Sequence, residues 1–96
     1  MTQNNLIREF EQQLEKNINE VVESIYRPQY FINMVDKYGY YQAAKKIASD
    51  REVSDGFTKL ALKQRLDLSI ESLIVNPKYE SIFTKDEINN CRIKLR

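Results

Sequence analysis

The sequence predicts an all-α fold, a compact bundle of about six or seven helices with one long N-terminal amphipathic helix followed by short helices. Gly and Pro occur only twice each, too few for an all-β chain with its many turns. Residues that favour helices, among them Lys, Glu, Gln, Leu, Ile and Ala, are abundant. Apolar side chains recur at steps of three and four, whereas strand-like alternation never extends beyond three or four residues.

Length and composition indicate one domain. The 96 residues are 42% hydrophobic and 30% charged, enough for a single modest core, so we expect residues 1–96 to form a single helical domain. The sequence shows no secretory leader, and no apolar run approaches the roughly 20 residues that cross a bilayer. The single Cys91 has no internal disulfide partner. We therefore expect a cytoplasmic protein without a membrane partner.

The first helix has the clearest pattern. Its apolar stripe consists of Leu6, Ile7, Phe10, Leu14, Ile18, Val21, Val22 and Ile25. This spacing predicts one amphipathic helix of about twenty residues. Ile7, Leu14 and Val21 lie seven apart, which would suit a coiled-coil partner. Fewer than three full heptads and the polar Asn17 favour packing within the chain instead.

Proline and glycine predict the next two breaks. Pro28 lacks an amide donor and restricts the residue before it, which predicts a helix boundary within residues 26–29. A short helix with apolar residues from Phe31 to Tyr38 should stop at Gly39, which suits a left-handed conformation, and a new helix should carry Ala43 onward.

Four later helix starts are marked by side chains that can accept hydrogen bonds from the free amides of a first helical turn. In chain order they are Ser54 or Asp55, Asp67 or Ser69, Asn76 before Pro77, and Thr84 with Glu87 as a capping box.

The stretch SDGFTKLALKQRLDLSIESLI, residues 54–74, is interpreted as a joint between helices rather than a reactive site. Its structural corner is predicted to comprise Gly56, Arg65, Asp67 and Glu71. We expect Arg65 to be held by one of these carboxylates or by helix-end carbonyls. Leu60 and Leu62 are expected to be buried. In the alternative interpretation, the carboxyl groups of Asp67 and Glu71 act as a catalytic pair in a pocket.

Four segments resemble a small helical domain of uncharacterised bacterial proteins: IYRPQYFINMVDKYGYYQAAKKI, SDGFTKL, RLDLSIESLI and YESIFTKDEI. The resemblance covers the chain from Ile25 to the C-terminus. It implies a recurring domain, free-standing or joined to other modules, that has no established activity.

The residue types argue against an enzyme. The chain has no His, no Trp, one Cys and no Gly-rich loop, so the usual nucleophile and base pairs, zinc sites and phosphate cradles cannot be assembled. We expect no catalytic residues, no cofactor and no metal ligands, and we interpret Cys91 as a small buried hydrophobe.

A cluster of aromatic side chains instead predicts a protein-binding surface. Six of the sixteen positions 26–41 are aromatic, and tyrosine suits surfaces that alternate between solvent and a partner. We predict that this surface binds another protein or a second copy of the chain, as a homodimer, through Tyr26, Tyr30, Tyr40 and Tyr41. Neighbouring side chains on a helix cannot both face one core, so at least one of Tyr40 and Tyr41 should point outward. In the alternative, these tyrosines only pack across helix faces.

Nucleic-acid binding is the second hypothesis. Two short helices around Gly39 superficially resemble a helix-turn-helix. Residues 1–36 carry three basic and six acidic side chains, whereas residues 37–96 carry twelve basic and eight acidic ones. The predicted basic face consists of Lys45, Lys46, Arg51, Lys59, Lys63 and Arg65. The overall charge of +1 is low for a protein that binds phosphates, so this hypothesis ranks second.

Overall fold

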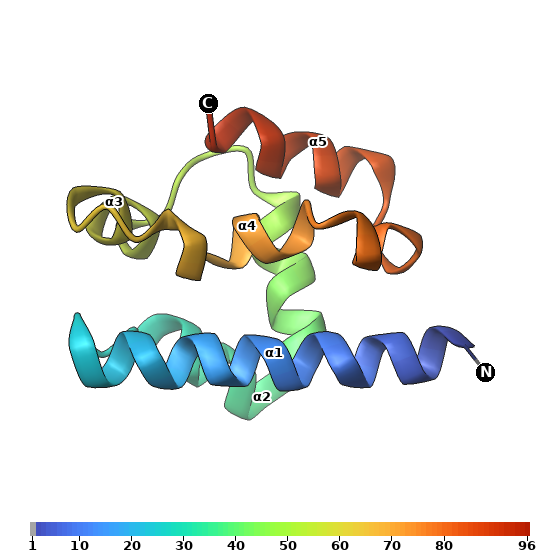
Figure 1. The fold of residues 1–96 in the computed structure, drawn as a ribbon, viewed down its shortest axis with the longest axis horizontal. Coiled ribbons are helices and arrows are strands. Elements are labelled where there is room, and N and C mark those ends of the chain that lie inside the picture. Colours follow the sequence, from blue (N-terminus) through green and yellow to red (C-terminus); the bar gives the residue numbers. More distant parts are fainter. Residues whose placement is uncertain (1) are drawn as a thin grey trace.

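The chain folds into α-helices and two short 3-10 helices, η1 and η2, in the computed structural model, which describes residues 2–96 (Figure 1). The elements are α1 (Thr2–Ser24), α2 (Gln29–Ser49), α3 (Asp55–Leu62), η1 (Leu66–Leu68), α4 (Ile70–Ile74), η2 (Pro77–Ile82) and α5 (Lys85–Lys94). Within residues 2–96 there is no strand, and the predicted all-α class is confirmed.

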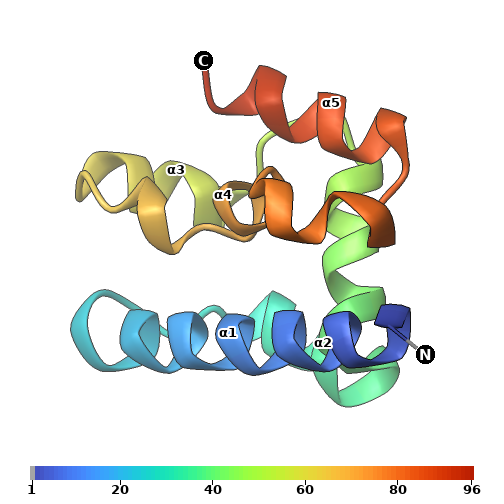
Figure 2. The ribbon, with the colours of Figure 1, turned by 45° about the vertical axis from the view of Figure 1, so that its right-hand side comes forward.

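The helices lie in three layers (Figures 1 and 2). α1 forms one outer layer, α3 and α4 lie in the middle, and α5 forms the opposite outer layer. The first part of α2 lies beside α1, and its second part crosses toward α5. α2 therefore packs against α1, α4 and α5, and it connects all three layers.

The apolar stripe of α1 packs within the chain. Phe10, Leu14, Ile18 and Val21 are all buried. The intramolecular packing that the short heptad pattern favoured is thus confirmed, because this stripe faces α2, η1, α4 and η2. Among the described residues, no helix combines the length and the apolar character needed to cross a bilayer.

Gly39 bends α2. Its φ of 84° and ψ of 166° lie in a region open essentially to glycine alone, so the helical hydrogen-bond pattern is broken at this residue. The break that the sequence predicted at Gly39 is confirmed. A bend of this kind frees the amides that follow it, and the Tyr41 amide donates a 3.0 Å hydrogen bond to the Glu11 carboxylate. A side chain from α1 therefore caps the second part of α2.

An aromatic cluster holds α1 to α2 and to the region of η2. The ring of Phe10 meets those of Tyr41, Tyr79 and Phe83 edge-on, with centroids 6.4, 5.2 and 5.0 Å away. The Tyr41 hydroxyl donates a hydrogen bond to the Ile82 carbonyl. These contacts join residues far apart in the sequence, and they fix the position of α1 relative to α2 and η2.

Side chains cap the later helix starts where the sequence predicted. Each acceptor receives a backbone N–H at about 3 Å, a normal hydrogen-bond length. The pairs are Ser54 with Phe57, Ser69 with Ser72, Asn76 with Lys78, and Thr84 with Glu87 in a complete capping box. Where the sequence left two candidates open, Ser54 caps rather than Asp55, and Ser69 caps rather than Asp67.

The buried residues form two clusters. The main cluster lies among α1, α2, α4, η2 and α5 and includes Phe10, Phe31 and Ile74. A smaller second cluster consists of Val21, Leu60 and Leu68. The second cluster joins the end of α1 to α3 and η1, and the space between the two clusters positions the candidate site.

Replacing Gly39 with alanine tests the bend. A Cβ atom at this position forces a strained backbone, so Gly39→Ala should lower the free energy of unfolding by about 1–3 kcal/mol, measured by urea denaturation. Gln42→Ala, an exposed change on the same helix, serves as the control and should alter it by less than about 0.5 kcal/mol. Equal stability of Gly39→Ala and the wild type would contradict the account of the bend.

Candidate binding surface

An apolar slot of 530 Å³ opens between the two buried clusters. Ile18 and Phe31 of the main cluster line it, together with Leu60 of the second cluster and with Phe57, a buried residue of α3. Tyr26 and Pro28, from the connection between α1 and α2, complete the wall. Its volume and mainly apolar lining are typical of sites that accept a small molecule or a partner's side chain.

Three polar residues that line the slot are already engaged. Ser54 and Ser69 accept capping hydrogen bonds, and Glu71 pairs with Lys94. Within residues 2–96, no buried side-chain nitrogen or oxygen lacks a hydrogen-bond partner. The interior of the slot therefore offers burial of apolar surface rather than a free polar contact.

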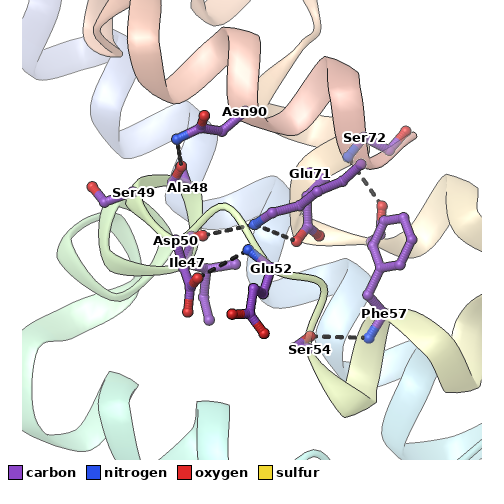
Figure 3. Close-up of polar contacts among 12 residues, drawn as sticks. Ile47, Ala48, Ser49, Asp50, Glu52, Ser54, Phe57, Glu71, Ser72 and Asn90 are labelled. Carbon is purple, nitrogen blue, oxygen red and sulfur yellow. Dashed lines mark hydrogen bonds and ion pairs between the residues drawn. The ribbon is translucent and has the colours of Figure 1, made fainter. Parts of the chain in front are cut away.

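The pair of Glu71 and Lys94 lies beneath the slot. Their charged atoms are 3.5 Å apart, with side chains only 3% and 2% exposed. Lys94 also donates a 2.9 Å hydrogen bond to the Ile47 carbonyl at the end of α2, and Figure 3 shows Glu71 turned toward this region. Burial raises the pKa of Glu71, and Lys94 opposes that rise. The pair ties α4 to α5 and to α2.

The prediction that Glu71 belongs to the corner with Arg65 is therefore wrong, because Glu71 pairs with Lys94. Arg65 instead pairs with Glu20 at 2.9 Å and with Asp67 at 3.1 Å. Hydrogen bonds to Asp67 and Glu20 raise the pKa of Arg65, and the guanidinium lowers the pKa of Asp67. All three side chains are at least 39% exposed, so these pairs add little to stability.

The backbone defines this corner more firmly than the ion pairs do. Gln64 has a φ of 57°, the left-handed conformation. Its N–H donates to the Ala61 carbonyl at 3.0 Å, and the Arg65 N–H donates to the Leu60 carbonyl at 2.8 Å. These two bonds form a Schellman motif that ends α3. Sequence reasoning missed it because glycine, the usual signal, is absent.

Gly56 lets Tyr26 approach α3 closely. A Cβ atom at Gly56 would lie 2.2 Å from the Tyr26 hydroxyl oxygen, so no side chain fits without moving the ring. Burial, and to a lesser extent Asp55, raise the pKa of Tyr26, and the Lys59 ammonium lies 4.6 Å from its ring centroid. Gly56 thus shapes the slot and lies apart from the Arg65 ion pairs. Leu62, expected to be buried, is 79% exposed.

The four tyrosines predicted to bind a partner occupy different environments. Tyr30 is 74% exposed and Tyr26 is half-buried in the wall of the slot. Tyr40 is half-buried against the main cluster, and burial, with Glu15 and Asp36, raises its pKa. Tyr41 belongs to the aromatic cluster described above. Only Tyr30 presents most of its ring to solvent, so Tyr41 in particular is a packing residue.

A second hollow, the Tyr38 groove, adjoins the slot. It has a volume of 460 Å³ and runs along α2 to the loop before α3. Tyr30 lines both hollows. Tyr38 and Val53, 45% and 49% exposed, lie in the groove, and neither was among the residues predicted to bind a partner. We call the slot, the groove and the ring between them the Tyr30 surface.

The basic residues of the nucleic-acid hypothesis are interrupted by acidic ones. Lys45 pairs with Glu87 at 2.9 Å, and Arg65 is neutralised by its two carboxylate partners. Arg51 shares a hollow of 660 Å³ with Asp86 and Glu87. Lys46 and Lys59 lie over tyrosine rings, and Lys63 is exposed at the C-cap of α3. Of these six side chains, Lys45 and Arg65 are thus paired with carboxylates in salt bridges.

Cys91 lies in the interior near the buried ion pair. It has no exposed surface, and burial, with a smaller contribution from Glu71, raises its pKa to about 12. The expected role as a small buried hydrophobe agrees with this placement. Among residues 2–96, no three His, Cys, Asp or Glu side chains are grouped so as to hold a metal ion.

Comparison with known proteins gives no relative from which a function could be transferred. A scan against family models, a search of curated proteins and a search of solved structures each found no match to the chain. The resemblance noted from Ile25 onward stays a prediction, and a functional proposal has to be argued from the Tyr30 surface itself.

The corner can be tested at Gln64. Gln64→Gly removes the strain of a left-handed non-glycine residue and should raise the free energy of unfolding by about 0.5–1 kcal/mol. The same change in mid-helix, Gln42→Gly, should lower it by about 1 kcal/mol. Urea denaturation of both variants separates the relief of strain at Gln64 from the general effect of glycine on a helix. A loss of stability in both variants would contradict the Schellman assignment.

The buried ion pair can be tested by removing its cation. Lys94→Met leaves Glu71 charged and unpaired, and should lower the free energy of unfolding by about 3–5 kcal/mol at neutral pH. Because burial raises the pKa of Glu71 above its ordinary 4.5, the folded state holds the proton more tightly than the unfolded chain. The contribution of Glu71 to the free energy of unfolding therefore falls as pH rises from 4.5 through the raised pKa. The loss in Lys94→Met should accordingly shrink at acid pH.

Lys78→Met is the matched control for the same measurement. Lys78 pairs with Glu9 at 3.4 Å, but both side chains are more than half exposed. Urea denaturation across a pH series should show that Lys78→Met changes the free energy of unfolding by less than about 1 kcal/mol. This change should not shrink at acid pH as the loss in Lys94→Met does. Equal losses in Lys78→Met and Lys94→Met would contradict the role given to the buried pair.

Proposed function

We propose that this chain is a small, non-catalytic helical module that binds protein, either another chain or itself, through the Tyr30 surface. The observation that carries the proposal is the position of Tyr30. Its ring is 74% exposed and stands between two hollows, one of them an apolar slot of 530 Å³. Tyrosine is enriched among the residues that dominate the binding energy of protein interfaces.

The slot is suited to an apolar side chain of a partner. Ser69 and Glu71, its buried polar residues, already have partners, so an entering aliphatic or aromatic group does not leave them unpaired. Burial of such a group gains about 1.5–3 kcal/mol. Tyr30 at the rim would then help to exclude water from the contact.

Exposed apolar surface near Tyr30 supports the same function. Tyr38 and Val53 each expose nearly half of their surface and line the adjoining groove. Scattered exposed apolar residues are ordinary, but side chains gathered around hollows are typical of interaction sites.

The other two functions receive less support. Acidic partners of Lys45 and Arg65 reduce the positive potential that phosphate binding requires. The chain lacks His, and its one thiol is buried with a pKa raised to about 12, which supports a non-catalytic role.

The proposal predicts that Tyr30→Ala weakens association without unfolding the chain. Self-association by sedimentation equilibrium, and binding of any purified and identified protein partner by calorimetry, should both be measured. Loss of an interface anchor should reduce the affinity at least about tenfold. The thermal midpoint should stay near that of the wild type, because the removed ring is mostly exposed.

Leu62→Ala is the matched control. Leu62 is 79% exposed, similar to Tyr30, but lines neither hollow. It should therefore bind like the wild type. Equal binding by Tyr30→Ala and the wild type, or an equal loss in both variants, would contradict a role for the Tyr30 surface.

A further inference from the structure

We infer that the protein partner is a second copy of this chain, joined through the Tyr38 groove in a two-fold symmetric contact. This inference rests on the proposed function and specifies its partner. It follows from the way charges are distributed along the groove.

The part of the groove around Tyr38 is basic. The ammonium groups of Lys37 and Lys46 lie 5.9 and 4.5 Å from the ring centroid of Tyr38. Side chains on a helix lean toward its N-terminus, which agrees with Lys46 reaching back to Tyr38 rather than toward Asp50. Both cations therefore gather around one aromatic ring.

The part of the groove formed by the loop after α2 is acidic. Asp50 and Glu52 lie in the loop that follows α2, and both line the groove. The Glu52 N–H donates a 3.0 Å hydrogen bond to the Asp50 carboxylate, and Figure 3 shows this contact. That bond holds the Asp50 carboxylate against the short turn that carries Glu52.

None of these four charged side chains forms an ion pair with another residue of the described part of the chain, residues 2–96. Met34 and Ile47, both half-buried, and the more exposed Val53 also line the groove. The groove thus combines two cations beside the Tyr38 ring, two anions in the loop after α2, and apolar side chains.

Such a surface is complementary to itself. In a two-fold contact the same patch is used by both copies, and residues in one part meet those in the other. A two-fold axis between these two charged parts places the lysines of each copy against the carboxylates of its partner. A partner carrying only one sign of charge would instead be repelled by one part of the groove.

The contact also covers the exposed apolar groups. Val53 and the rings of Tyr30 and Tyr38 line the groove, so a second copy seated there removes them from water. Because the groove is short, we expect a dimer that dissociates on dilution and weakens with added salt, as exposed charge pairs do.

Charge reversal tests the arrangement. One double variant, Lys37→Glu with Lys46→Glu, makes both parts acidic, and another, Asp50→Lys with Glu52→Lys, makes both parts basic. Each variant alone should form a homodimer at least about tenfold more weakly than the wild type, because like charges then face each other. An equimolar mixture should restore a heterodimer of near wild-type affinity. Sedimentation equilibrium, with one variant carrying a mass tag, measures the dimerisation affinity of each variant alone and of the mixture.

The control is Lys63→Glu with Lys85→Glu. It changes the net charge as much as the first variant does, but at exposed positions outside the groove. This control should dimerise like the wild type, and circular dichroism should show the same helix content for every variant.

The outcomes separate this inference from the proposed function. Restoration in the mixture supports the two-fold contact. A wild-type chain that stays monomeric at every concentration, or a mixture that fails to restore the dimer, overturns the inference. If the monomeric chain still binds an identified protein and Tyr30→Ala abolishes that binding, only the inference that the partner is a second copy is wrong. If neither kind of association occurs, both proposals fall.

Discussion

The bend at Gly39 is the constraint on which the rest of the fold depends. A straight helix of this length would contact one layer along its side, whereas the bent α2 lies beside α1 and then crosses to α5. Only glycine adopts the required backbone conformation without strain. The amide of Tyr41 is satisfied by Glu11 of α1, so the bend and the packing of the first helix stabilise each other.

Local signals were sufficient to predict the elements. The break at Gly39, the caps at Ser54, Ser69 and Asn76, and the capping box at Thr84 each depend on residues within a few positions, so the sequence alone carries them. The stripe of α1 was equally visible, because its spacing follows the helical repeat. The all-α class follows from these features together.

Contacts between distant residues were not predictable in the same way. Glu71 and Lys94 are 23 positions apart, and nothing in their local sequence distinguishes a buried pair from two solvated charges. The residues next to Tyr41 do not reveal that its ring packs against Phe10 and Phe83. The position of Tyr30 between two hollows likewise depends on how α2, α3 and the loop before α3 meet. The candidate surface was therefore only partly foreseen, through Tyr26 and Tyr30 of the four proposed tyrosines.

The slot between the two buried clusters also gives the molecule unequal local stability. α3 contributes Phe57 and Leu60 to the interior, while the rest of its surface is largely exposed. Its separation from the other helices would uncover two large apolar side chains, a cost of about 3–6 kcal/mol. The aromatic cluster around Phe10 would stay intact in such an opening. α3 can thus exchange its amide hydrogens through a partial opening in which the three layers remain assembled.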